Sequence, residues 1–337
     1  TMVGVITGLF GISCLYMGLV QNAWMLGVGY VLLRMLGASA LMIVSSNVIN
    51  QWWVERRGTV MGISGVVVAL VGMGLFTNLV HGLLQRFDWR TTYVILGLME
   101  LLVMLPLGLL LFRDRPEDHG LHPDGQLEGR GDLNTGSAAP ISWTQGQALR
   151  TPAFWVTVAS FAATSLLGTG LYFHMVSIFE SQGLSSNVAA AVYLPISVTS
   201  AVVRLGSGYL ADRIPVRILL AVGLIAMSGV LGLAQIIDGT SLAVIYGVVM
   251  GLSGGITGVV GSVIWADYFG RRHLGSISGL ATSISRISSA LGPLPLALAF
   301  DLLGGYDLAL KIEMVIPLAL AGLNLFVKPP RGLPAGD

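Results

Sequence analysis

Long apolar runs follow one another along the chain and are separated by short polar segments. Each run holds about 20 residues, the helix length needed to cross a hydrocarbon core of ~30 Å. Lipid offers no partner to free backbone groups, so we expect helices rather than open strands. The ten runs lie near residues 2–20, 24–50, 59–83, 90–112, 152–179, 186–210, 216–236, 240–265, 275–300 and 308–326.

One long polar segment, residues 113–151, interrupts this pattern and contains three prolines and several glycines. Such a composition is typical of a solvated linker between two parts of a chain. We therefore expect an N-terminal bundle over residues 1–112, a central loop over 113–151, a six-helix bundle over 152–328 and a tail over 329–337.

The composition supports a membrane protein with many spans. Hydrophobic residues make up 54% of the 337 residues and charged residues 10%, whereas soluble domains carry about 25% charged residues. The soluble globular, disordered and collagen-like classes are therefore excluded. The net charge of +1 gives no indication of a nucleic-acid partner. Cys14 is the single cysteine of the sequence, so neither an intrachain disulfide nor a multi-cysteine metal site is possible.

The loops differ strongly in basic residues. When alternate loops are assigned to one side, that side holds twelve Lys and Arg residues and the other holds three. The positive-inside rule then predicts that the richer side and both ends of the chain are cytoplasmic. The remaining three basic residues, Arg34, Arg204 and Arg286, lie inside predicted spans.

The two halves repeat each other at an offset of 215 residues. The pattern of Val48-Ile49 followed by Arg56-Arg57 returns as Val263-Ile264 followed by Arg271-Arg272. Repeats in one membrane orientation are typical of transporters that bind substrate between the halves. The same offset predicts two further helices ahead of Thr1, so we expect this chain to be an N-terminally truncated form of a twelve-helix protein.

Several loop motifs resemble those of the major facilitator superfamily. The segment 208–213, Gly-Tyr-Leu-Ala-Asp-Arg, is similar to the signature loop between the second and third helices of each half. Segment 115–125 is similar to the start of the central loop in the monocarboxylate-porter and oxalate/formate-antiporter branch, and segments 53–58 and 268–275 resemble two short cytoplasmic loops of that branch. The resemblance implies a major facilitator fold in which the visible helices are the third to the twelfth.

The resemblance also implies a gating role for the signature loop, in which charge pairing locks one face of the two-bundle assembly. The residues concerned are Gly208, Asp212, Arg213 and Arg217. A cytoplasmic loop with an incidental acid is the simpler alternative.

Charged residues inside predicted spans are functional candidates, because a cation at a helix centre costs about 2.5–3.5 kcal/mol on insertion scales. Arg204 lies about eight residues before Asp212, and the tilt of its Cβ aims the side chain at the midplane. We expect it to bind an anion, with structural pairing as the alternative. Arg286 lies among serines and threonines, and Arg34 lies on a helix that the fold places at the cavity. Both are candidates for substrate binding.

His174, beside Tyr172, is a further candidate for substrate binding, and its reference pKa of about 6.5 suits a coupling proton. An interfacial histidine without such a role is the alternative. Glu100 lies in a span that is peripheral in this fold, where a structural role is expected before proton coupling. Gly247, Gly251 and Gly255 lie four residues apart, a spacing that predicts close helix packing.

These observations together predict a secondary transporter of small organic anions, either mono- or dicarboxylates. It works by alternating access in the plasma membrane, and a bacterial inner membrane fits best. Proton symport and anion exchange both stay open, and we expect a monomer with no cofactor and no metal ion. No phosphate-binding loop, metalloprotease motif or nucleophile elbow supports an enzyme. The alternatives are drug or metabolite efflux, against which the run 59–83 lacks a proline, and a transport-dead sensor or gene fragment.

Overall fold

The computed structural model describes residues 2–68, 71, 76–111, 116 and 142–330. Within this part of the chain every ordered element is a helix, which confirms the predicted all-α class. Eight of these helices are long and apolar enough to cross a membrane, and two shorter apolar helices, Met2–Gly18 and Arg57–Val68, lie in the runs near 2–20 and 59–83. Most of the predicted central loop, including the motif at 115–125 apart from Pro116, and most of the tail lie outside the described residues.

Large apolar side chains point outward from these helices. Trp24 is 87% exposed, Leu302 77% and Phe173 72%. An aqueous surface of this kind would be unfavourable, since each exposed apolar Å² costs roughly 25 cal/mol relative to burial. The outward faces are therefore suited to lipid.

The chain divides into two compact units. The first contains Thr1–Glu55 and Val67–Ser137, and the second contains Arg56–Val66 and Ala138–Asp337. The helices of the first unit are α1 (Met2–Gly18), α2 (Ala23–Leu33), η1 (Arg34–Leu41), α3 (Met42–Trp52), α5 (Thr77–Arg86), α6 (Trp89–Met99), η3 (Glu100–Met104) and α7 (Leu105–Leu111). Of these, η1 and η3 are π-helical, and α2, η1 and α3 form one continuous span.

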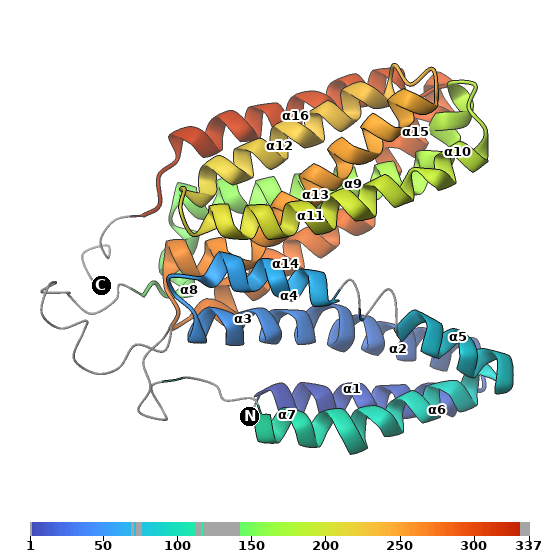
Figure 1. Ribbon diagram of the computed structural model, residues 1–337, viewed down its shortest axis with the longest axis vertical. Helices are drawn as coiled ribbons and strands as arrows, with labels where there is room; N and C mark the ends of the chain where they lie inside the picture. Colours follow the sequence, from blue (N-terminus) through green and yellow to red (C-terminus); the bar gives the residue numbers. More distant parts are fainter. Residues whose placement is uncertain (1, 69–70, 72–75, 112–115, 117–141, 331–337) are drawn as a thin grey trace, which may run out of the picture. The chain divides into compact units, whose positions relative to one another are not determined.

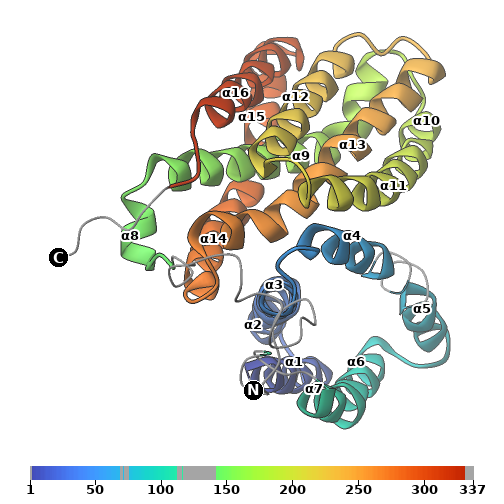
Figure 2. The same ribbon diagram turned by 60° about the vertical axis from the view of Figure 1, so that its left-hand side comes forward.

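Helix α1 packs against α6, η3 and α7 in the first unit. Figures 1 and 2 both show α1 beside α6 and α7. The contact runs through Gly4, Gly11 and Gly18, which lie seven residues apart and therefore on one face of α1. A Cβ added to Gly11 would lie 2.7 Å from Cγ of Leu101, and one added to Gly97 would lie 3.0 Å from the carbonyl oxygen of Gly11. Glycine is thus what lets these helices approach so closely.

Polar side chains in the loops cap the N-termini of the helices that follow them. Asn22 accepts a hydrogen bond from the backbone N–H of Met25 at 2.9 Å at the start of α2. Asp88 accepts one from Thr91 at 3.3 Å at the start of α6. Hydrogen bonding from Thr91 lowers the pKa of Asp88 below its usual range, so the cap is charged at neutral pH.

The second unit holds the remaining helices, including α4 up to Val66. They are α4 (Arg57–Val68), α8 (Gln145–Leu149), α9 (Pro152–Ser181), α10 (Ser186–Ala191), α11 (Tyr193–Ala211), α12 (Val216–Ala234), α13 (Thr240–Phe269), α14 (Leu274–Leu291), α15 (Pro293–Leu303) and α16 (Asp307–Phe326). Helices α10 and α11 form one span, and so do α14 and α15.

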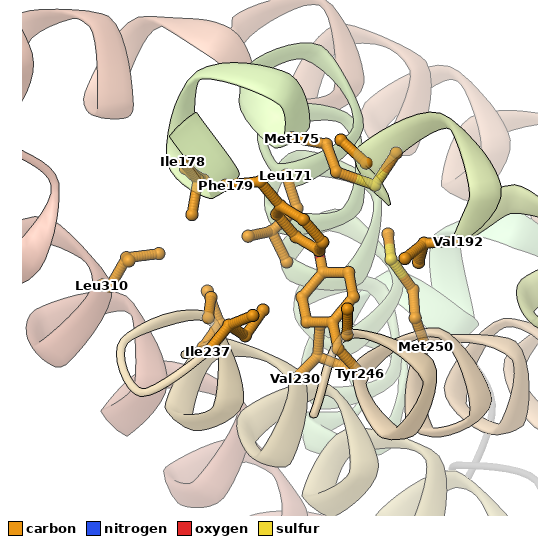
Figure 3. Packing of buried hydrophobic residues seen from close by; sticks show 14 of the residues in the cluster. Leu171, Met175, Ile178, Phe179, Val192, Val230, Ile237, Tyr246, Met250 and Leu310 are labelled. Carbon is orange, nitrogen blue, oxygen red and sulfur yellow. The ribbon is translucent and has the colours of Figure 1, made fainter. Parts of the chain in front are cut away.

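The core of this unit is apolar and tightly closed. Helices α9, α12, α13 and α16 lie side by side around it (Figure 1). Figure 3 shows Phe179 and Tyr246 meeting at the centre, with ring centroids 5.5 Å apart. Both side chains are almost fully buried, as are Leu171, Met175 and Leu310 around them.

The three glycines of α13 that the sequence predicts to allow close packing lie against α11. Gly247, Gly251 and Gly255 of α13 face this helix, and a Cβ on Gly251 would lie 2.5 Å from the carbonyl oxygen of Ile196. On the other side of the unit, α9 meets the break between α14 and α15, where a Cβ on Gly170 would lie 2.7 Å from the carbonyl oxygen of Gly292. The predicted close packing at α13 is therefore confirmed.

We expect Gly251→Ala to destabilise the protein by about 1–3 kcal/mol. The added methyl group would clash with backbone atoms of α11, which cannot move aside as a flexible side chain could. Gly254→Ala is the matched control on the same helix, since nothing lies within 4 Å of its added Cβ. Thermal unfolding in detergent, followed by size-exclusion chromatography, measures the difference. Equal melting temperatures for the two variants would contradict the packing argument.

Candidate functional site

The guanidinium of Arg204 on α11 lies between a glycine of α4 and a glycine of α13, inside the second unit. A Cβ added to Gly65 of α4 would lie 3.1 Å from one Nη atom of Arg204, and a Cβ added to Gly258 of α13 would lie 3.0 Å from the other. The side chain is half-buried. It lies seven residues, or about 10 Å, before the end of α11 at Ala211. No hydrogen bond or ion pair joins it to any of the residues that the structure describes.

Tyr172 of α9 stacks on Tyr193 of α11, with ring centroids 6.0 Å apart. Both rings are also more than 40% exposed. Tyr193 lies eleven residues before Arg204, which is three helical turns, so the two residues occupy the same face of α11 about 16 Å apart along it. The structure thus aligns two candidates from the sequence, Tyr172 and Arg204, through a tyrosine that the sequence analysis had missed.

His174 faces the opposite way from Tyr172. Its Nε2 lies 3.0 Å from the carbonyl oxygen of Pro293 and its Nδ1 lies 3.4 Å from the hydroxyl of Tyr306. Tyr306 in turn donates a hydrogen bond to Oγ of Ser177 at 2.8 Å. His174 therefore joins α9 to α15 and to the start of α16, and the structure does not bring it together with Tyr172.

The other two arginines have different surroundings. Arg286 lies on the exposed side of α14, a helix whose main packing partner is α9 rather than α11. Arg34 belongs to the first unit, begins the π-helical segment η1, and lies over the ring of Tyr30 at 5.6 Å. Glu100 begins the other π-helical segment, η3, and is half-buried.

Asp212 caps the start of α4. Its carboxylate accepts hydrogen bonds from the backbone N–H of Gly58 at 2.5 Å, from that of Thr59 at 2.8 Å, and from the hydroxyl of Thr59 at 2.6 Å. These backbone groups have no partner within the helix, and the N-terminus of a helix favours a negative charge. The acid of the signature loop is thus held by a helix end that lies 154 residues away in sequence.

Gly208 makes this contact possible. It lies against Gly58 and Gly62 of α4, and a Cβ on Gly62 would lie 2.6 Å from the carbonyl oxygen of Arg204. Small residues on both helices let α4 and α11 touch through their backbones. The same glycine contacts therefore bring α4 to Asp212 at one end and to Arg204 at the other.

The basic residues of the signature loop do not pair with Asp212, although the sequence led us to expect charge pairing there. Arg213 lies over the ring of Tyr209 at 4.0 Å. Arg217 is in the first turn of α12, and its Nη1 is buried without a hydrogen-bond partner. In the described part of the chain, the partner of Asp212 is therefore the N-terminus of α4.

Glu313 of α16 was missed by the sequence analysis. It is 6% exposed, and its Oε1 is buried without a hydrogen-bond partner. The rule that singled out the three arginines would have found it, since it is an ionisable residue within the predicted span 308–326.

Long apolar helices that carry ionisable groups in their interior are typical of polytopic membrane proteins with a functional site within the membrane. The sequence model described as Major Facilitator Superfamily matches residues 1–293. The chain therefore belongs to the major facilitator superfamily, a superfamily of transporters. Comparison with curated proteins gives no match.

Solved structures confirm the fold. The transporter FucP in the outward conformation superposes with a TM-score of 0.65 at 15% identity, covering 95% of this chain and 82% of that one. The E. coli fucose:proton symporter FucP (N162A) gives 0.64 at 13%, covering 96% and 82%. The proton:xylose symporter XylE bound to 6-bromo-6-deoxy-D-glucose gives 0.63 at 12%, covering 96% and 78%. At these identities the likeness concerns the fold alone.

We expect Asp212→Ala to destabilise the protein by about 0.5–2 kcal/mol, the usual cost of a lost helix cap. Arg213→Ala should cost less, because Arg213 stacks on Tyr209 and does not pair with Asp212. Thermal unfolding of both variants, and of Thr59→Ala alone and combined with Asp212→Ala, measures the coupling. Equal losses for Asp212→Ala and Arg213→Ala, with no coupling to Thr59, would restore the charge-pairing hypothesis.

Proposed function

We propose that the protein is a secondary active transporter that moves small organic anions, mono- or dicarboxylates, across the membrane by alternating access. The observation that carries this proposal is Arg204, a half-buried guanidinium inside a spanning helix with no acidic partner among the described residues. A desolvated cation of this kind is costly unless something pairs with it. A carboxylate from the substrate would supply the missing charge.

Arginine is suited to this task because its planar fork can donate two parallel hydrogen bonds to a carboxylate. Gly65 and Gly258 lie against the guanidinium, and a Cβ at either position would come within 3.1 Å of an Nη atom. We infer that these two glycines keep the fork in one orientation and leave room for the anion.

The stacked pair Tyr172 and Tyr193 extends the same face of α11 away from Arg204. We infer that it contacts the apolar part of the substrate or forms the upper wall of its path. Arg286, His174 and Arg34 are supporting candidates for substrate binding.

Asp212 is the proposed gate. We infer that its cap on α4 holds one conformation of the signature loop and is released when the transporter changes state. The three hydrogen bonds support this role, because all of them would break together if α11 and α4 separated.

The membrane arrangement follows from the charges. We infer a plasma-membrane protein, most simply of a bacterial inner membrane, with the arginine-rich loops and both ends of the chain in the cytoplasm. A monomer suffices for alternating access. We infer proton coupling, the mode described for FucP and XylE, which share the fold.

Arg204→Gln should abolish carboxylate uptake, because a lost charge-assisted pair in a desolvated site costs about 2–5 kcal/mol, or at least 30-fold in affinity. Arg204→Lys should retain part of the uptake, since it keeps the charge and loses the fork. Uptake of radiolabelled lactate and oxalate by cells or liposomes measures both.

The matched control is Lys328→Gln, which removes one positive charge from an exposed position beyond α16. It should leave uptake unchanged, with all three variants present in the membrane in equal amounts. Normal carboxylate uptake by Arg204→Gln would overturn the assignment of the anion site.

Arg204 and Arg286 together would favour a substrate with two carboxylates. If both contact one anion, oxalate binding should lose more than lactate binding from Arg286→Gln, and the losses from the double variant should not be additive. Titration calorimetry on wild type, both single variants and the double variant measures this. Additive losses of equal size for both anions would show that the two arginines serve different purposes.

A further inference from the structure

Glu313 is the most deeply buried acidic side chain that the structure describes inside a spanning helix, with 6% exposure. It lies on the face of α16 that also carries Leu310 and Asn324, both of which are buried. Asn324 donates a hydrogen bond to Oγ of Ser160 on α9 at 2.7 Å, and Leu310 belongs to the apolar core in Figure 3. Glu313 therefore points into the helical bundle and away from lipid.

The neighbouring helices offer Glu313 no partner. Ser228 of α12 contacts α16 next to Glu313 in sequence, but its hydroxyl donates to the carbonyl oxygen of Met314 at 2.9 Å. Oε1 of Glu313 is buried with no hydrogen bond. No ion pair joins the carboxyl to any residue in the described part of the chain.

The titratable side chains of α9 either contact other residues than Glu313 or are exposed. Tyr172 stacks against α11, and His174 contacts the carbonyl oxygen of Pro293 and the hydroxyl of Tyr306. Glu180 is exposed in the last turn of α9.

The other packed helices place their charges at their ends. Arg217 of α12 lies eleven residues before Ser228, about 16 Å along the helix. Asp301 of α15 is exposed, and so are Asp307 and Lys311 in the first turns of α16. Glu313 is therefore a solitary carboxyl among apolar side chains.

The backbone at Glu313 is also unusual. Pro317 lies four residues later, inside α16. A proline has no N–H to donate to the carbonyl four residues before it, and it bends the helix there. The carboxyl thus lies at a point where α16 can change its curvature with little loss of hydrogen bonding.

We propose that Glu313 is a proton-binding site of this transporter, and that the proton it binds accompanies the organic anion through the cycle. The carboxylate takes up one proton, which forms one O–H bond and changes the charge of the side chain from −1 to 0. The neutral acid tolerates the closed apolar interface, whereas the charged form requires water. Binding and release on opposite sides of the membrane therefore follow the opening of the α16 interface at Pro317.

The coupling half of this proposal rests on the proposed anion transport, so the test separates the two. Wild-type protein in liposomes should exchange lactate for lactate, and a pH gradient of about one unit should drive roughly tenfold accumulation when one proton moves with each monoanion. Glu313→Gln, which mimics the protonated form, should retain exchange and lose accumulation. Glu180→Gln is the matched control and should retain both.

Infrared difference spectra between low and high pH detect protonation of the Glu313 carboxyl, and no substrate is needed for this measurement. Wild type should show a carboxylic-acid C=O band that is absent from Glu313→Gln and displaced in Glu313→Asp, which also serves if the glutamine variant does not fold. Tenfold accumulation by Glu313→Gln, or an infrared band unchanged in both variants, would overturn the proposal. Absence of lactate and oxalate exchange in wild type would instead refute the anion assignment, and the infrared band would still decide the proton site.

Discussion

The hydrocarbon core of the membrane provides no hydrogen-bond partners, and the rest of this structure depends on that constraint. It forces the backbone into helices and removes much of the hydrophobic drive for helices to associate. Packing then depends on close van der Waals contact, which glycine permits. Glycines accordingly occupy the helix contacts of both units, as at Gly11 and Gly97 in the first and Gly251 and Gly292 in the second.

Because the hydrocarbon core also makes charge costly, the few charged groups inside the spans are candidates for function. In the second unit, Arg204 and Glu313 are a cation and an acid, each without a partner in the described residues, and each belongs to a different helix interface. They do not neutralise each other. A site for an anion and a site for a proton within one bundle would allow a neutral pair to cross the membrane together.

Helix α11 brings together the proposed gate and the proposed anion site. Its glycine at 208 brings it into backbone contact with α4, its arginine at 204 lies between α4 and α13, and its end at Asp212 caps α4. Any motion that separates α4 from α11 would therefore disturb the proposed gate and the proposed anion site at once. Coupling between the loop that follows α11 and a site about 10 Å back along the same helix needs no further element.

The sequence by itself determined the helical class, the positions of the spans, the glycine spacing on α13 and the identity of Arg204 as an intramembrane cation. These are local properties, because hydropathy and residue spacing act within one helix. Only the tertiary structure decided that Asp212 binds the start of α4, that Tyr172 and His174 face different helices, and that Glu313 is enclosed. Each of these depends on which helices pack together and with what rotation. Contacts between residues up to 164 positions apart, as between Asn324 and Ser160, are fixed by the packing of whole helices.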